Sequence, residues 1–133
     1  MKHTILAVSR TRCWNRNGCL FPSEETTLMR VNMPHNKTFE LRYIIKSVML
    51  VSPEPEEGFE DLHAAASTAP RIITYWDKDN NRIAPQRSKN NKTLSQAFIN
   101  RIHSVVVDYG IDDGIASPVL VETYTFQETE INL

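Results

Sequence analysis

The sequence predicts an α+β protein: a single domain, residues 1–133, with a mostly antiparallel sheet of about five or six strands. One long and one short helix are expected on one face of the sheet. Three observations predict this class. The length of 133 residues is typical of one domain. Apolar residues make up 41% of the chain and only four residues are glycine, which argues against disordered and fibrous proteins. The patterns of the chain follow the order strands, helix, hairpin, helix, strand.

The N-terminal part of the chain predicts three strands. Residues 3–9 form a short apolar run that suits a buried strand. Residues 26–33 predict a second strand, and residues 34–37 predict a turn after it. At the start of residues 38–51, apolar and charged side chains alternate with period two. This pattern predicts a long strand, with a bulge where Ile44-Ile45 breaks the alternation.

A hairpin turn is expected at Asn17-Gly18, because both positions of such a two-residue turn need positive φ. The turn fixes the pairing of the strands on either side of it. In that register Cys19 faces Arg16 and Cys13 faces Pro22. The two cysteines are then not cross-strand partners, so we expect free thiols and a reducing compartment.

The middle of the chain predicts a short helix followed by a hairpin. Prolines 53 and 55 end the preceding strand, and the acids that follow suit the first turn of a helix running to about Ser67. Residues 71–76 form a β-prone run. Residues 77–81 are a cluster of turn residues, and residues 82–84 predict the short return strand.

The last third of the chain predicts a long helix and a final strand. Thr93-Leu94-Ser95-Gln96 fits a capping box, with Thr93 as the cap. Apolar residues then recur at helical spacing from Leu94 to Tyr109, and Gly110 suits the helix C-terminus. Residues 111–117 predict a loop, and residues 118–127 predict the last strand.

The charges of the chain fall into four blocks of alternating sign. Residues 1–52, 53–69, 70–107 and 108–133 carry net charges of +5, −5, +5 and −6, which give the chain its net charge of −1. Segregated charge of this kind favours association with a partner. The acids of the second block have a structural reason to be there, because they begin a helix. The bases of the third block have no such reason.

The third block therefore supplies the predicted binding surface. Its basic loop leads to the predicted helix N-terminus, where free N–H groups favour an anion. Two aromatic residues of the preceding strand would add stacking surfaces if they are exposed. The predicted partner-binding residues are Arg71, Tyr75, Trp76, Lys78, Arg82, Arg87, Lys89, Asn91 and Lys92.

Sequence motifs give no support for catalysis or metal binding. Asp77-x-Asp79-x-Asn81 resembles half of a calcium loop, but Arg82 and Ser88 replace the Gly and Glu that such a loop needs. The two cysteines and four histidines lack the paired spacing of a zinc site. Nucleophile and phosphate-loop motifs are also absent from the sequence. We therefore expect a protein that is not an enzyme and has no cofactor.

Two functional hypotheses remain. The first is a non-enzymatic binding protein that engages an anionic partner, a nucleic acid or a nucleoprotein complex, and that would suit a small viral or mobile-element inhibitor. The second is a protein–protein assembly subunit, such as a homo-oligomer or virion-type component, that uses complementary charged patches. The sequence has neither a signal peptide nor an apolar run long enough for a membrane span, so we expect a cytoplasmic protein with no membrane partner.

Overall fold

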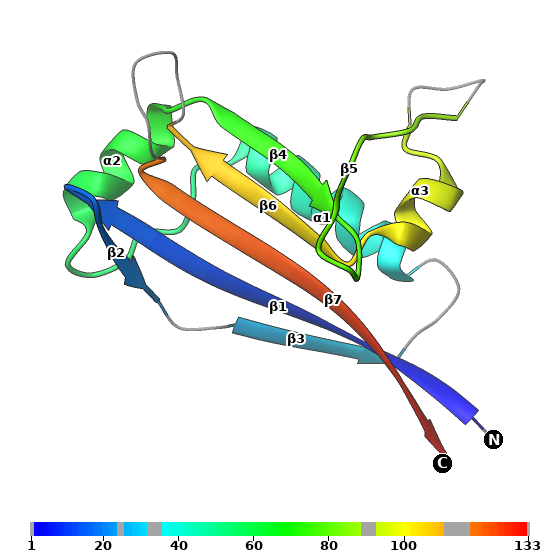
Figure 1. Cartoon of the computed structure of the whole chain (residues 1–133). Helices are drawn as coiled ribbons and strands as arrows, with labels where there is room; N and C mark the ends of the chain where they lie inside the picture. The colour runs from blue at the N-terminus through cyan, green and yellow to red at the C-terminus, as the bar shows by residue number, and fades with distance from the viewer. Residues whose placement is uncertain (1, 24–25, 32–35, 89–92, 111–117, 133) are drawn as a thin grey trace.

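The structure is a computed structural model that describes residues 2–23, 26–31, 36–88, 93–110 and 118–132 (Figure 1). These residues form seven strands and three helices. In chain order the elements are β1 (Lys2–Arg16), β2 (Cys19–Pro22), β3 (Thr26–Val31), α1 (Asn36–Leu50), α2 (Glu60–Thr68), β4 (Arg71–Trp76), β5 (Arg82–Ile83), α3 (Gln96–Arg101), β6 (Ser104–Tyr109) and β7 (Leu120–Asn132).

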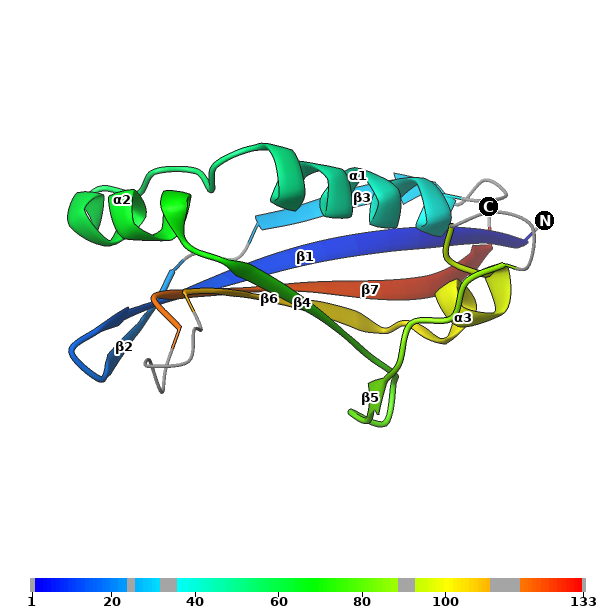
Figure 2. The ribbon, with the colours of Figure 1, turned by 90° about the horizontal axis from the view of Figure 1, so that it is seen from above.

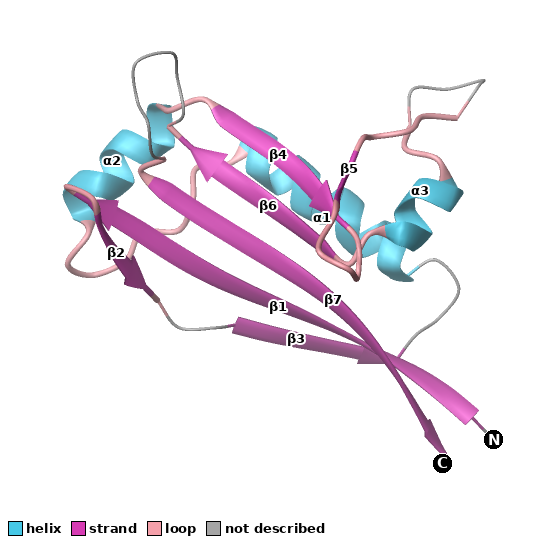
Figure 3. Cartoon of the chain, in the orientation of Figure 1, coloured by secondary structure: helices cyan, strands magenta, loops and turns pink. Residues whose placement is uncertain are grey.

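All seven strands belong to one antiparallel sheet (Figure 3). The strand order is β2-β1-β7-β6-β4-β5, and β3 also pairs with β1. Strand β7 pairs along one edge of β1. The other edge of β1 is therefore shared by β2 and β3. The long β1–β7 pair aligns Lys2 with Asn132 and runs to Trp14 opposite Leu120.

Helices α1 and α2 cover the same face of the sheet (Figure 2). The predicted α+β class, with one long and one short helix on one face, is therefore confirmed. Alternate residues of each strand point toward the helices, as the period of two requires. The buried apolar residues include Leu6, Val8 and Trp14 of β1, Leu41, Ile44 and Val48 of α1, Phe98 of α3, Val105 and Val107 of β6, and Leu120 and Phe126 of β7.

The first hairpin forms as predicted. Asn17 and Gly18 have φ values of 54° and 86°, as a turn of this kind requires. Cys19 pairs with Arg16 and Cys13 pairs with Pro22, so the predicted register is confirmed. Both cysteines are free thiols.

The prediction of a strand over residues 38–51 is wrong, because residues 36–50 form helix α1. The predicted turn is also wrong from Asn36 onward, while residues 34–35 lie outside the described residues. The alternation that suggested a strand came from Phe39 and Tyr43, which are both exposed. The residues that the helix buries recur at helical spacing instead: Thr38, Leu41, Ile44 and Val48.

The prediction of a helix from Leu94 to Tyr109 is wrong in its second half. Helix α3 ends at Arg101, and Ser104 begins strand β6. In β6, residues 105, 107 and 109 are buried in alternation, so their spacing also fits a strand. The helix begins at Gln96 and its N-cap is Ser95, whose hydroxyl accepts a hydrogen bond from the Phe98 amide at 3.2 Å, so the predicted cap at Thr93 is also wrong.

Gly110 follows strand β6, although it was predicted to end a helix. Its φ of 98° lies in the region that favours glycine. Its amide donates to the Pro70 carbonyl at 2.9 Å, which joins the end of β6 to the start of β4. Residues 111–117, predicted to form a loop, lie outside the described residues. Strand β7 then begins at Leu120, close to the predicted start.

The acidic second block pairs with the basic strand β1, so its acids do have partners within the chain. Arg10 contacts Glu54 at 3.2 Å, and Arg16 contacts Asp61 at 2.8 Å. Trp14 Nε1 donates to the Glu56 carboxylate. These β1 side chains lie at alternate positions and therefore share one face of the strand. They hold α2 and the segment between α1 and α2, residues 51–59, which we call the strap.

Candidate functional site

Strand β4 places its predicted site residues on two different faces. Tyr75 is buried and packs edge-on against Phe98, with ring centroids 5.2 Å apart, so it belongs to the core. Trp76 follows it and therefore points to the other face, where its Nε1 donates to Thr74 Oγ1 at 3.0 Å. Arg71 is half-buried, lies over the Tyr109 ring and donates to the Ser67 carbonyl at 3.2 Å. These three residues do not form one exposed surface.

The remaining predicted residues are also dispersed. Lys78 lies in the β4–β5 turn, Arg82 lies on β5, and both are exposed. Arg87 is exposed beside α1 and α3, where residues 86–88 pair with 93–95. Lys89, Asn91 and Lys92 lie outside the described residues. Helix α3 has only six residues, so the predicted anion site at a long helix N-terminus has no support.

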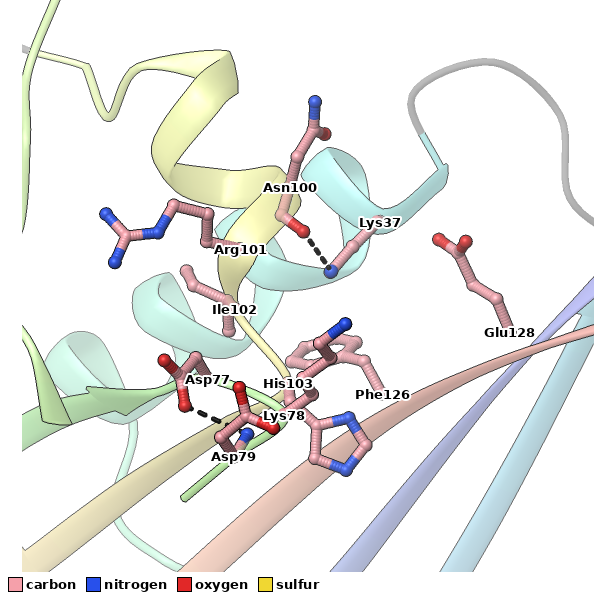
Figure 4. Close-up of a pocket in the computed structure, with 10 residues that line it drawn as sticks. All are labelled: Lys37, Asp77, Lys78, Asp79, Asn100, Arg101, Ile102, His103, Phe126 and Glu128. Carbon is pink, nitrogen blue, oxygen red and sulfur yellow. Dashed lines mark hydrogen bonds between the residues drawn. The ribbon is translucent and has the colours of Figure 1, made fainter. Parts of the chain in front are cut away.

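Lys78 lines a polar pocket of about 440 Å³ between the starts of α1 and β6 and the β4–β5 turn (Figure 4). The pocket contains charges of both signs, because Asp77, Asp79 and Glu128 face it together with Lys37, Lys78 and Arg101. Asp77 is committed to the turn: its Oδ1 accepts from the amides of Asp79 and Asn81 at 3.0 and 2.9 Å. These hydrogen bonds, the one from Asn81 first, lower the Asp77 pKa. Burial lowers the Lys37 pKa, and its Nζ donates to the Asn100 carbonyl at 3.4 Å.

A second hollow is lined by basic side chains and, among the described residues, by no acidic one. It has a volume of about 490 Å³ and lies between α1 and the segment that carries α3; we call it the basic groove. Apolar side chains from both walls form its floor, and three bases lie around them. None of the described residues that line it is acidic. The lining residues are Leu41, Arg42, Ile45, Lys46, Met49 and Leu50 of α1, with Tyr75, Arg87, Thr93, Leu94 and Ile99 opposite.

The outer side of α1 continues this surface. Phe39, Tyr43, Met49 and Leu50 are 63%, 63%, 58% and 71% exposed, which is high for large apolar side chains. The exposed charges of α1 among the described side chains are Arg42 and Lys46. Glu40, the acid of this helix, is buried. The basic groove and the helix beside it therefore combine exposed apolar area with positive charge.

A buried polar network crosses the sheet below the strap. Arg12 and Glu122 are 5% and 2% exposed, and Arg12 Nε lies 3.2 Å from Glu122 Oε2. Tyr109 donates its hydroxyl to Glu122 Oε1 at 2.6 Å, and Arg12 Nη2 donates to the Glu54 carbonyl at 2.6 Å. Burial, and then the charge of Glu122, raises the Tyr124 pKa to about 12. In this network one Glu122 oxygen is held by the Tyr109 hydroxyl and the other by Arg12.

Other kinds of site find no support in the described part of the chain. No three His, Cys, Asp or Glu side chains there are grouped so as to hold a metal ion. Among the same residues, no helix is long and apolar enough to cross a membrane.

Sequence analysis identified only Arg87 of the groove bases and missed Arg42 and Lys46. In a strand, residues 42 and 46 would lie beside residues 40 and 44, whereas in a helix they lie beside Met49 and Leu50. The spacing of Leu41, Ile44 and Val48 was the sequence feature that indicates the helix.

Comparison with known proteins finds no matching protein family, curated protein or solved structure.

Proposed function

We propose that this protein is a non-enzymatic binding protein that docks on an acidic segment of a partner protein through the basic groove and the exposed side of α1. One observation carries the proposal: the groove combines an apolar floor with the three bases Arg42, Lys46 and Arg87. None of its described lining residues is acidic. Apolar side chains favour a partner with apolar anchors, and the bases favour carboxylates around those anchors. An amphipathic acidic helix supplies both.

This proposal keeps the anionic partner predicted from the sequence but changes its preferred nature. A bare nucleic acid would use the bases and leave most of the apolar floor unfilled. Assembly through complementary charged blocks has less support, because β1 and the acidic segment 54–61 pair within one chain. Nucleic-acid binding is therefore the alternative outcome of the test.

The test uses a labelled 15-residue amphipathic peptide with Leu and Glu at helical spacing, measured by fluorescence anisotropy. We expect saturable binding, weakened about tenfold by the double substitution Arg42→Glu/Lys46→Glu, because two attractive contacts become repulsive. Met49→Glu should weaken binding by placing a charge on the apolar floor. The matched control is Arg82→Glu, which reverses an exposed base outside the groove and should leave binding unchanged.

Two further probes discriminate between the alternatives. The same peptide with Lys in place of Glu should not bind. A 20-nucleotide single-stranded DNA should bind more weakly than the acidic peptide. Tight DNA binding that falls steeply with salt, together with no binding of the acidic peptide, would overturn the proposal in favour of nucleic acid.

A further inference from the structure

A third hollow, separate from the basic groove, lies on the other side of α1. It consists of two adjoining spaces of about 380 and 210 Å³ between α1, strands β1 and β7, and the strap. The two spaces share five lining residues and so form one cleft, which we call the strap cleft. The shared residues are Arg10, Tyr43, Ser47, Glu54 and Tyr124.

Two buried carboxylates line the strap cleft. Glu122 and Tyr109 line the smaller space, and the Glu122 carboxylate is held by the Tyr109 hydroxyl and by Arg12. Both of its oxygens are therefore occupied. Glu40 lines the larger space, where it is buried and has an interaction of its own. Both carboxylates bring negative charge to the cleft, so an anionic ligand there needs a cation beside it.

That cation is Arg10, at the mouth of the cleft. Its side chain is 20% exposed, and its Nη2 donates to Glu54 Oε2 at 3.2 Å. Its buried Nε has no hydrogen-bond partner among the described residues. Glu54 comes from the strap, and its side chain is 70% exposed. The contact thus joins a fixed cation in the cleft to a carboxylate that water can solvate.

The rest of the cleft suits a small organic molecule. Val8 and Ile44 provide apolar contact in the larger space. Tyr43, Ser47 and Tyr124 bring three hydroxyl groups to both spaces. An apolar surface with a few convergent polar groups and one fixed charge is the usual composition of a small-molecule site, and the larger space has a typical volume for one.

We propose that the strap cleft binds a small organic carboxylate, which replaces Glu54 on Arg10. The Arg10 guanidinium donates two hydrogen bonds to the ligand carboxylate, a bidentate geometry in which Nε gains a partner. The body of the ligand lies between Val8 and Ile44 and meets the three hydroxyls. Glu54 occupies Arg10 in the absence of ligand and is released to solvent when the ligand binds. This site is separate from the basic groove, although Tyr43 belongs both to the cleft and to the exposed side of α1.

The experiment titrates the whole chain with 4-hydroxybenzoate, succinate and acetate by calorimetry, and follows the ¹H–¹⁵N resonance of Arg10 Nε by NMR. At least one carboxylate should bind and shift that resonance. 4-Hydroxybenzamide, which has the same shape without the charge, should not. Glu54→Gln should tighten binding about two- to fivefold, because it removes an exposed ion pair that competes with the ligand.

Two variants control for indirect effects. Glu57→Gln changes a neighbouring exposed acid of the strap that does not line the cleft, and it should leave affinity unchanged. Arg10→Gln should abolish binding, while circular dichroism checks that the variant is folded. The proposal is overturned if no carboxylate binds to the Glu54→Gln variant at millimolar concentration. It is also overturned if the amide binds equally well, or if Glu57→Gln tightens binding as much as Glu54→Gln does.

Discussion

Arg12 and Glu122 bury opposite charges where β1 and β7 pair, at facing positions of the two strands. Removing charges from water costs several kcal/mol per ion, and the attraction between the charges offsets this cost only when both partners are present. Here the Tyr109 hydroxyl donates a further hydrogen bond to Glu122, and the Glu54 carbonyl accepts one from Arg12. The pair therefore fixes the position of the strap relative to the sheet, and each partner depends on the other.

This dependence predicts a strong asymmetry between single and double variants. Arg12→Leu leaves Glu122 charged and buried, so the free energy of unfolding should fall by about 3–5 kcal/mol. Arg12→Leu/Glu122→Gln removes both charges and keeps an oxygen for the Tyr109 hydroxyl. The double variant should therefore be at least about 1 kcal/mol more stable than the single variant. Urea unfolding measures both values, and a double variant less stable than Arg12→Leu would contradict the prediction.

At the scale of single elements, the ends of the strands depend on backbone positions with positive φ. Gly18 has a φ of 86° in the hairpin turn, and Gly110 has a φ of 98° after β6. The two sites differ in their surroundings. A Cβ added at Gly18 meets nothing within 4 Å, whereas one added at Gly110 lies 2.9 Å from Val119 Cγ2. Backbone strain alone acts at the first site, and a steric clash adds to it at the second.

The same substitution should therefore have unequal effects at the two sites. Gly18→Ala should lower the free energy of unfolding by about 1–2 kcal/mol, the usual cost of an L-residue in the left-handed region. Gly110→Ala should cost more, because Val119 and the adjoining β7 must also shift. Urea unfolding of the two variants side by side provides the measurement. Equal losses would show that the contact with Val119 is relieved without cost.

Helix α1 shows how an element can satisfy two patterns at once. Its first residues alternate in polarity, which is typical of a strand, while its buried residues follow helical spacing. Burial against the sheet selects the helix, because only that conformation buries Leu41, Ile44 and Val48 together. The same choice places Arg42, Lys46 and Met49 along one side of the basic groove. The conformation of this one element thus determines whether the proposed docking surface exists.

At the scale of the whole molecule, the acidic second block neutralises two arginines of the first block, while Arg42 and Lys46 of that same block stay exposed. The arginines of β1 pair with Glu54 and Asp61, and hydrogen bonding to Arg10 and Arg16 lowers the pKa of each carboxyl. A carboxyl whose pKa is lowered on folding stabilises the folded state above its unfolded pKa. That contribution is lost as the pH falls through the folded pKa. The ordinary values are 4.5 for Glu54 and 3.8 for Asp61, so the loss begins near pH 4.5.

Acid should therefore weaken the attachment of the strap and α2 to the sheet. In the wild-type protein we expect the free energy of unfolding to fall as the pH is lowered from 5 to 3. Glu54→Gln/Asp61→Asn should reduce that dependence, because the variant has no carboxyl to protonate at either contact. Chemical unfolding at a series of pH values provides the measurement, with Glu57→Gln as the control that should retain the wild-type slope. An unchanged slope in the double variant would mean that these pairs contribute nothing in solution.

The sequence by itself determined the elements that depend on neighbours along the chain. Asn17-Gly18 specifies the first hairpin and its register, because the turn geometry admits few other residues. Strand β4 and the turn at residues 77–81 also follow from local propensity and side-chain hydrogen bonds. Helix α2, with Glu60 and Asp61 in its first turn, follows from its acids and flanking prolines. From these elements the α+β class could be inferred.

Only the tertiary structure decided what depends on residues distant in the chain. Packing against the sheet made residues 36–50 a helix and divided residues 94–109 between α3 and β6, since their apolar spacing fits both conformations. It also brought Arg87 beside Arg42 and Lys46, and Glu54 beside Arg10. Sequence spacing cannot specify such contacts, because their partners lie some 40 residues apart and meet only when the sheet assembles.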